Sequence, residues 1–149
     1  MKITFLGTGT SQGVPVIACH CYVCRSTDPR DKRLRSSVMI RNQGKVFVID
    51  TGPDFRQQML THNVQQLDAV IFTHEHKDHM AGLDDVRAFN FKQKKAIDIY
   101  AAPQVHDAIK RDFHYAFDDQ KYPGVPSLEL IEIGNKKFVS LKSWPKYDE

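Results

Sequence analysis

Four side chains that can bind metal ions lie within six residues of one another in the stretch THEHKDH. They are His74, His76, Asp78 and His79. Three imidazoles and a carboxylate at this spacing favour a divalent-metal site over a polar loop with incidental histidines. Residues 67–72 before the stretch are apolar and rich in β-branched and aromatic types, which predicts a buried strand. The residues after it have helical spacing, so we expect the cluster on a turn between a strand and a helix.

The spacing within the cluster assigns the side chains to two metal positions. His74 and His76 are two residues apart, so in an extended backbone they project to the same side and can hold one cation. Asp78 and His79 follow where the chain turns, and they can face a second position. Two cations roughly 3.5 to 4 Å apart are an arrangement used in phosphate ester hydrolysis and related reactions. Imidazole and carboxylate suit zinc, manganese or iron, and we expect two divalent ions, Zn or Mn.

A second group of metal-binding residues lies nearer the start of the chain. Cys19, Cys21 and Cys24 are too close in sequence for comfortable disulfides with one another, but three thiolates can wrap one zinc ion. A closed site needs a fourth ligand, and His20 is the only local candidate, in a strained position. We expect a structural zinc here, with reduced free cysteines or a redox role as the alternatives. An odd number of clustered cysteines also argues against a secreted disulfide framework.

Hydrophobic patterning predicts the elements that position these residues. Asp50 ends one predicted strand, where its burial requires a partner. We interpret Asp50 as an acceptor from a ligand histidine, the alternative being a helix cap or a turn residue. Asp78 and Asp50 are therefore the candidate catalytic carboxylates. Strands are expected at residues 2–6, 38–41, 45–49, 67–72, 96–101, 128–133 and 136–141, and helices at residues 54–61, 83–91 and 103–113.

The composition is that of a globular domain with a mild positive charge. The 149 residues carry a net charge of +3 and have a pI near 8.7, a bias too small to indicate a nucleic-acid-binding surface. The arginines of residues 28–37 could reach an anionic substrate, but local pairs with aspartates are favoured. No apolar run approaches the ~18 residues of a transmembrane helix, and the residues after Met1 predict a strand rather than a signal peptide. We therefore expect a cytoplasmic protein that does not bind a membrane.

The HxHxDH spacing from His74 to His79 resembles the signature of the metallo-β-lactamase superfamily. The start KITFLGTGTSQGVP, the cysteine trio, the segment VIDTGPDFR and the GLDD after the histidines are similar to one branch. That branch contains the cyclic phosphodiesterases of phosphonate breakdown. The resemblance runs from Met1 to about Phe91. It implies an α+β fold of the αββα sandwich type and a structural zinc at the cysteines, completed by a histidine from the far end of the chain. In the superfamily the aspartate matching Asp50 lies beside the metals.

Superfamily members are usually considerably longer, because they are built from two similar αβ halves whose sheets pack face to face. Both halves contribute metal ligands. This sequence contains the motif of the first half and no counterpart of the later histidine and aspartate motifs. We therefore expect residues 1–149 to be a single domain that is incomplete at its C-terminus, or a half that pairs with another chain, for example as a homodimer.

The function that follows from the resemblance is metal-dependent hydrolysis. We expect a phosphodiesterase that attacks a cyclic or small phosphodiester with a metal-activated water. The preference for a phosphodiester rests on the branch, since the HxHxDH run serves thioesters, lactones, β-lactams and RNA equally well. The alternatives are a hydrolase of another bond, such as a lactone or thioester, and a non-catalytic metal-binding half-domain.

Overall fold

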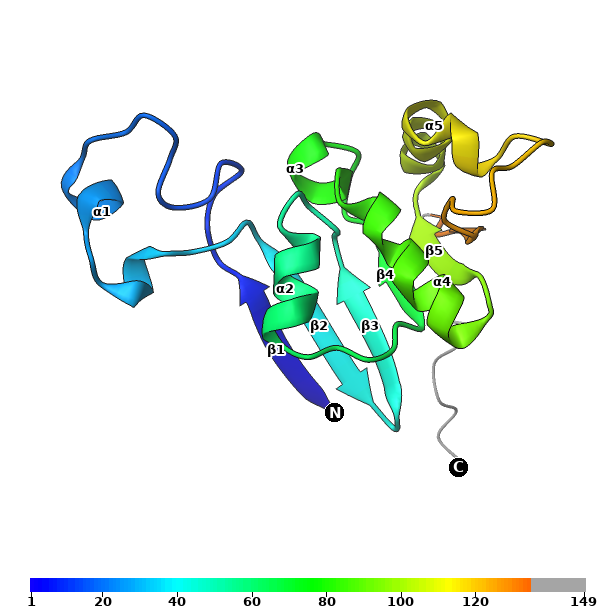
Figure 1. Cartoon of the computed structure of the whole chain (residues 1–149), viewed down its shortest axis with the longest axis horizontal. Helices are drawn as coiled ribbons and strands as arrows, with labels where there is room; N and C mark the ends of the chain where they lie inside the picture. The colour runs from blue at the N-terminus through cyan, green and yellow to red at the C-terminus, as the bar shows by residue number, and fades with distance from the viewer. Residues whose placement is uncertain (135–149) are drawn as a thin grey trace.

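The computed structural model describes residues 1–134, which form one mixed six-stranded sheet with helices packed against one face (Figure 1). The strands are β1 (Lys2–Gly7), β2 (Ser37–Asn42), β3 (Lys45–Ile49), β4 (Ala69–Ile71), β5 (Ile97–Ala101) and β6 (Leu128–Glu132). The α-helices are α1 (Tyr22–Arg25), α2 (Phe55–Thr61), α3 (Lys77–Met80), α4 (Arg87–Gln93) and α5 (Pro103–Asp112). Short 3-10 turns are η1 (Pro29–Asp31), η2 (Leu83–Val86) and η3 (His114–Ala116).

Most of the predicted elements are present with small shifts of their ends. The strand predicted at 67–72 is shorter and covers Ala69–Ile71, and the helix predicted at 83–91 is divided into η2 and α4. The helices α1 and α3 were not predicted, because four residues are too few to show a helical hydrophobic period. The strand predicted at 136–141 lies outside the described residues.

The sheet changes from antiparallel to parallel at its third strand. Strands β1, β2 and β3 pair antiparallel, and each neighbouring pair from β3 to β6 is parallel. The carboxyl ends of β3 and β4 therefore lie at the same edge, where the backbone N–H of Asp50 donates to the carbonyl of Ile71 at 3.0 Å. The residues that follow these two strands meet at this edge, which is where open α/β sheets place their sites.

Apolar side chains cover both faces of the sheet, and the larger cluster lies under the helices. Figure 1 shows α2 and α4 in front of the sheet. The central strands supply this cluster with Met39, Val48, Val70 and Ile99, which pack with residues of the helices such as Phe55. The opposite face carries a smaller cluster around three fully buried side chains, Phe47, Ala69 and Tyr100. A sheet that is apolar on both faces is expected of an inner layer.

A buried carboxylate holds the edge of the sheet opposite the histidine turn. Asp68 is 5% exposed and accepts from the backbone N–H of Val46 at 2.9 Å. The ammonium groups of Lys45 and Lys95 lie 3.0 and 3.3 Å from its Oδ1. Burial alone would raise the pKa of Asp68, but the Val46 bond and the lysines outweigh it and hold that pKa below the usual value.

We expect Asp68→Asn to lower the free energy of unfolding by about 1–3 kcal/mol at neutral pH, because the buried N–H of Val46 and the partly exposed Lys45 and Lys95 lose their charged acceptor. The folded-state pKa of Asp68 lies below the ordinary 3.8. Its contribution is therefore present above that pH and is lost as the pH falls through the folded-state value. Urea unfolding of both proteins at neutral and acidic pH measures this. Asp118→Asn, which changes an exposed aspartate, is the control. If the difference in unfolding free energy between the wild type and Asp68→Asn stays constant as the pH falls, Asp68 is not a stabilising buried carboxylate.

Candidate metal centre

The histidine turn, residues 73–79, leads from β4 into α3, so the cluster lies between a strand and a helix as predicted. The backbone N–H groups of His79 and Met80 donate to the carbonyl of His76 at 3.0 and 3.1 Å, which closes the single turn of α3. This turn gathers the three imidazoles. The ring centres of His74 and His76 are 4.6 Å apart, and those of His74 and His79 are 4.0 Å apart.

The two side chains predicted for the second metal position also lie together. His79 Nε2 is 3.2 Å from Asp78 Oδ2. Metal bonds of about 2.1 Å place two ligands of one ion about 3.0–3.4 Å apart for angles between square and tetrahedral, so this separation fits a shared cation. Lys77, which lies between His76 and Asp78 in sequence, pairs instead with Asp112 of α5.

The buried carboxylate of Asp50 lies behind the turn and accepts three hydrogen bonds. Its Oδ1 accepts the backbone N–H of Thr73 at 2.9 Å, and its Oδ2 accepts the Thr73 hydroxyl at 2.7 Å. His79 Nδ1 lies 2.8 Å from the same Oδ2. Because a carboxylate only accepts, His79 Nδ1 carries a proton towards Asp50, and Nε2 is the nitrogen that faces Asp78. Asp50 thus partners a histidine of the cluster, as predicted, and does not cap α2, which begins at Phe55.

The backbone of Asp50 is held in the left-handed region, with a φ of 62°. That conformation costs roughly 1–2 kcal/mol for a residue with a Cβ atom. The backbone N–H of Asp50 donates to Ile71, and its carbonyl accepts the hydroxyl of Ser37 at 2.9 Å. These bonds offset the cost and aim the carboxylate at the histidine turn, a pattern common at functional sites.

Two glycines allow the histidine turn to approach the loop after β3. A Cβ at Gly52 would lie 2.2 Å from the carbonyl oxygen of Asp78, and a Cβ at Gly82 would lie 2.2 Å from the carbonyl oxygen of Gly52. The N–H of Gly82 donates to the carbonyl of Thr51 at 2.8 Å. Neither glycine can carry a side chain unless the turn moves. The sequence alone indicated no role in the site for these glycines or for Thr73, and their signal was their place within the quoted motifs VIDTGPDFR, GLDD and THEHKDH.

The cysteine trio gives the clearest three-ligand geometry in residues 1–134. The sulfur atoms of Cys19, Cys21 and Cys24 all lie within 4.8 Å of one another, and no other group of three or more potential ligands in this range does so. Zn–S bonds of about 2.3 Å separate tetrahedral thiolates by about 3.8 Å, so the trio fits one zinc ion. The histidine turn instead brings one pair of ligand atoms close together, His79 Nε2 and Asp78 Oδ2 at 3.2 Å, and the assignment of its four side chains to two positions stays a prediction.

The thiols differ in acidity. The backbone N–H of Cys24, followed by hydrogen bonds with the thiols of Cys19 and Cys24, lowers the pKa of Cys21 to about 7. For Cys24, the hydrogen bond from the Val16 N–H is outweighed by burial and by the neighbouring thiols, so its pKa is raised. The cluster therefore holds one thiol that ionises near neutrality, and the thiolate is the form that binds metal.

The loop that carries the cysteines, residues 8–36, extends beside the end of β1 at the left of Figure 1. Val14 and Arg33 exchange backbone hydrogen bonds of 2.8 and 2.9 Å that close its base. Arg35 pairs with Asp54 at 2.9 Å and donates to the carbonyl of Ser11 at 2.8 Å. Arg30 pairs with Asp28. Arg30 is engaged in a local pair, as the sequence favoured, whereas Arg35 pairs with an aspartate 19 residues further along the chain.

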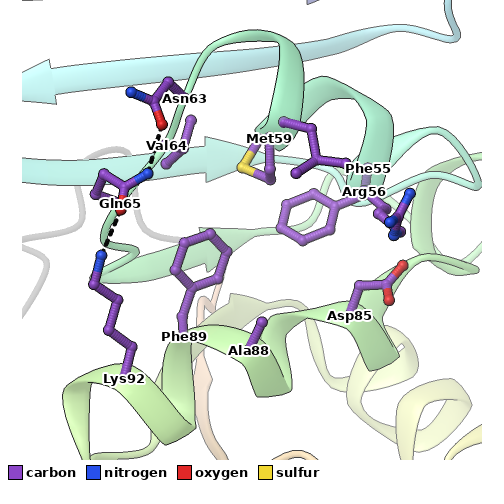
Figure 2. Close-up of a pocket in the computed structure, with 11 residues that line it drawn as sticks. Phe55, Arg56, Met59, Asn63, Val64, Gln65, Asp85, Ala88, Phe89 and Lys92 are labelled. Carbon is purple, nitrogen blue, oxygen red and sulfur yellow. Dashed lines mark hydrogen bonds between the residues drawn. The ribbon is translucent and has the colours of Figure 1, made fainter.

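A cavity of about 290 Å³ lies between α2 and α4, away from the histidine turn. Figure 2 shows its apolar side chains, among them Phe55, Met59 and Phe89, with Arg56 and Asp85 near one end. The four predicted metal ligands of the histidine turn do not line this cavity, and neither do the three cysteines. We place the candidate site at the histidine turn, where the convergent polar groups lie.

The comparisons with known proteins agree with this fold. Residues 45–143 match the family model described as the beta-lactamase superfamily domain. The chain therefore belongs to the metallo-β-lactamase superfamily, and the predicted superfamily and fold are confirmed. A diphosphatase of the PhnP family has a crystal structure that is 40% identical, with a TM-score of 0.84 over 94% of this chain and 52% of that one.

Two curated relatives show how varied the similar proteins are. A Porphyromonas gingivalis protein named octanoyltransferase is 48% identical over 89% of this chain and 27% of its own length. A ribonuclease Z from Methanococcus aeolicus is 26% identical over 99% of this chain and 41% of its own length. The chain thus spans between about a quarter and about half of these relatives. In the part of the chain that the structure describes, no helix is both long and apolar enough to cross a membrane.

We expect Cys21→Ser to remove about one zinc ion per chain, because the loss of one of three thiolate ligands removes most of the affinity of the site for zinc. Elemental analysis after desalting measures the loss. Tyr22→Phe, next to it and exposed, is the matched control. Unchanged zinc in Cys21→Ser would show that the trio is not the zinc site.

We also expect Asp78→Ala and His76→Ala to lose manganese bound at the histidine turn. Manganese separates this turn from the cysteines, because it prefers carboxylate and imidazole to thiolate. Glu75→Ala changes an exposed carboxylate of the same turn and should keep its manganese. Equal manganese binding by all three variants, measured by titration of the full chain, would refute the ligand assignment.

Proposed function

We propose that the histidine turn is the metal-binding part of a hydrolase active site, and that the bond cleaved is a small or cyclic phosphodiester. The observation that carries this proposal is the order imposed by Asp50. Its buried carboxylate leaves His79 Nε2 3.2 Å from Asp78 Oδ2, a prepared ligand pair at the edge of the sheet.

Each side chain of the histidine turn has a distinct role in this proposal. His74 and His76 would hold one divalent ion, and Asp78 and His79 a second. Bound ions would supply a water of lowered pKa and neutralise charge on the phosphoryl group. Asp50 holds a proton on His79 Nδ1, so Nε2 is the nitrogen that would bind a cation beside Asp78. The partly exposed turn leaves the ligands accessible to a substrate.

The likeness to a PhnP-family diphosphatase favours phosphorus over carbon as the centre attacked. That protein is 40% identical over nearly the whole of this chain. Diphosphates and phosphodiesters share the anionic phosphoryl group that a pair of cations would bind. We therefore rank phosphodiesters first and include diphosphates in the substrate panel.

An acyl substrate is the second candidate. The Porphyromonas gingivalis relative at 48% identity has a name that describes transfer of an octanoyl group. The same ligand set can serve attack on a thioester carbonyl. Because this chain matches only 27% of that protein, the name supports an acyl thioester as a substrate to test and ranks below the phosphodiester.

We expect the manganese- or zinc-loaded chain to hydrolyse bis(p-nitrophenyl) phosphate or a cyclic phosphodiester, with His76→Ala lowering kcat/KM by about 100-fold or more because one ion is lost. An assay with a diphosphate and an octanoyl thioester in parallel separates the candidates. Glu75→Ala should retain activity and serves as the control.

Each outcome of this panel has a consequence. Turnover of the thioester alone would replace the first candidate with the second. Metal binding without turnover of any substrate would contradict a hydrolase and favour the non-catalytic metal-binding alternative.

A further inference from the structure

Thr73 lies between the buried carboxylate of Asp50 and the imidazole of His74. Its hydroxyl oxygen is 2.7 Å from Asp50 Oδ2 and 3.0 Å from His74 Nδ1. Its backbone N–H donates to Oδ1 of the same carboxylate at 2.9 Å. Thr73 is therefore held at both carboxylate oxygens, although its own side chain lies at the surface.

The count of protons settles the direction of these bonds. A threonine hydroxyl has one proton and two lone pairs, and a carboxylate has only lone pairs. The proton of Thr73 therefore points to Asp50, and the hydroxyl oxygen accepts from His74. The imidazole of His74 must then supply the proton from Nδ1, and in the neutral ring Nε2 is left without a proton. Nε2 is then the nitrogen of His74 that can bind a cation.

We propose that Thr73 is a positioning residue that sets the tautomer and ring orientation of His74 by relaying the charge of Asp50. The consequence for catalysis rests on the proposed function, whereas the tautomer does not. His79 receives the same orientation directly, with Nδ1 2.8 Å from the same Oδ2. One buried carboxylate thus orients one histidine at each of the two predicted cation positions.

This arrangement makes a selective prediction. Removal of the Thr73 hydroxyl leaves Asp50 and His79 in contact but breaks the only bond through which Asp50 reaches His74 among the described residues. His74 should then exchange between its two tautomers. A purely structural role for Thr73 would disturb both histidines together.

The test compares Thr73→Val, which keeps the shape and removes the hydroxyl, with Thr73→Ser, which keeps the hydroxyl. Long-range proton–nitrogen NMR of the full chain, treated with chelator in mildly alkaline buffer, reports the tautomer of each histidine. We expect His74 to be protonated at Nδ1 in the wild type and in Thr73→Ser, and to shift towards Nε2 in Thr73→Val. His79 should stay protonated at Nδ1 in all three.

Metal titration provides a second measurement. Thr73→Val should weaken manganese binding at the histidine turn by about 10–100-fold, the usual effect of removing a partner of a ligand histidine. Thr73→Ser should stay close to the wild type. Thr61→Val removes an exposed hydroxyl of α2 that accepts only from Gln57 among the described residues. It serves as the control, and thermal unfolding checks that each variant is folded.

A His74 tautomer that does not change in Thr73→Val, or one protonated at Nε2 in the wild type, would overturn the inference. So would an equal shift of both histidines. The two proposals can fail separately. A selective tautomer shift in a chain without hydrolytic activity leaves the role of Thr73 standing and removes the proposed function. Hydrolytic activity together with a His74 tautomer that does not change in Thr73→Val would leave the proposed function standing and remove the role of Thr73.

Discussion

The carboxylate of Asp50 is the interaction on which the arrangement of the site depends. It is 4% exposed, and its partners Thr73 and His79 are 23 and 29 residues further along the chain. A buried carboxylate without donors is unstable, so the fold that buries it must also deliver the histidine turn. The parallel pairing of β3 with β4 does so, because it brings the ends of both strands to one edge of the sheet.

The same requirement explains the unusual backbone around the site. Asp50 adopts a left-handed conformation, and its side chain reaches Thr73 and His79, which follow the neighbouring strand. Gly52 and Gly82 then permit the contact, since a side chain at either position would meet a carbonyl oxygen of the opposing segment. Strain and missing side chains are local costs, and a rigid set of three hydrogen bonds at the carboxylate offsets them.

What the sequence predicted correctly depended on local spacing. The strands, the place of the histidines between a strand and a helix, and the strand-end position of Asp50 all follow from residues close in sequence. Thr73, Gly52 and Gly82 could not be assigned, because their roles exist only when segments distant in sequence touch. The four-residue helices α1 and α3 were not predicted for a different reason, since about one helical turn is too short to show a repeating hydrophobic pattern.

The two candidate metal sites differ in a way that bears on how each ion is held. Three thiolates of one loop can supply most of a tetrahedral zinc site, so that ion would act as a cross-link within residues 8–36. The histidine turn supplies two ligands to each predicted position, which leaves several coordination positions for water, substrate or other protein groups. Open positions lower the affinity for the ion but are required for chemistry. The Asp50 network compensates by orienting in advance two of the four predicted ligands of the turn, His74 and His79.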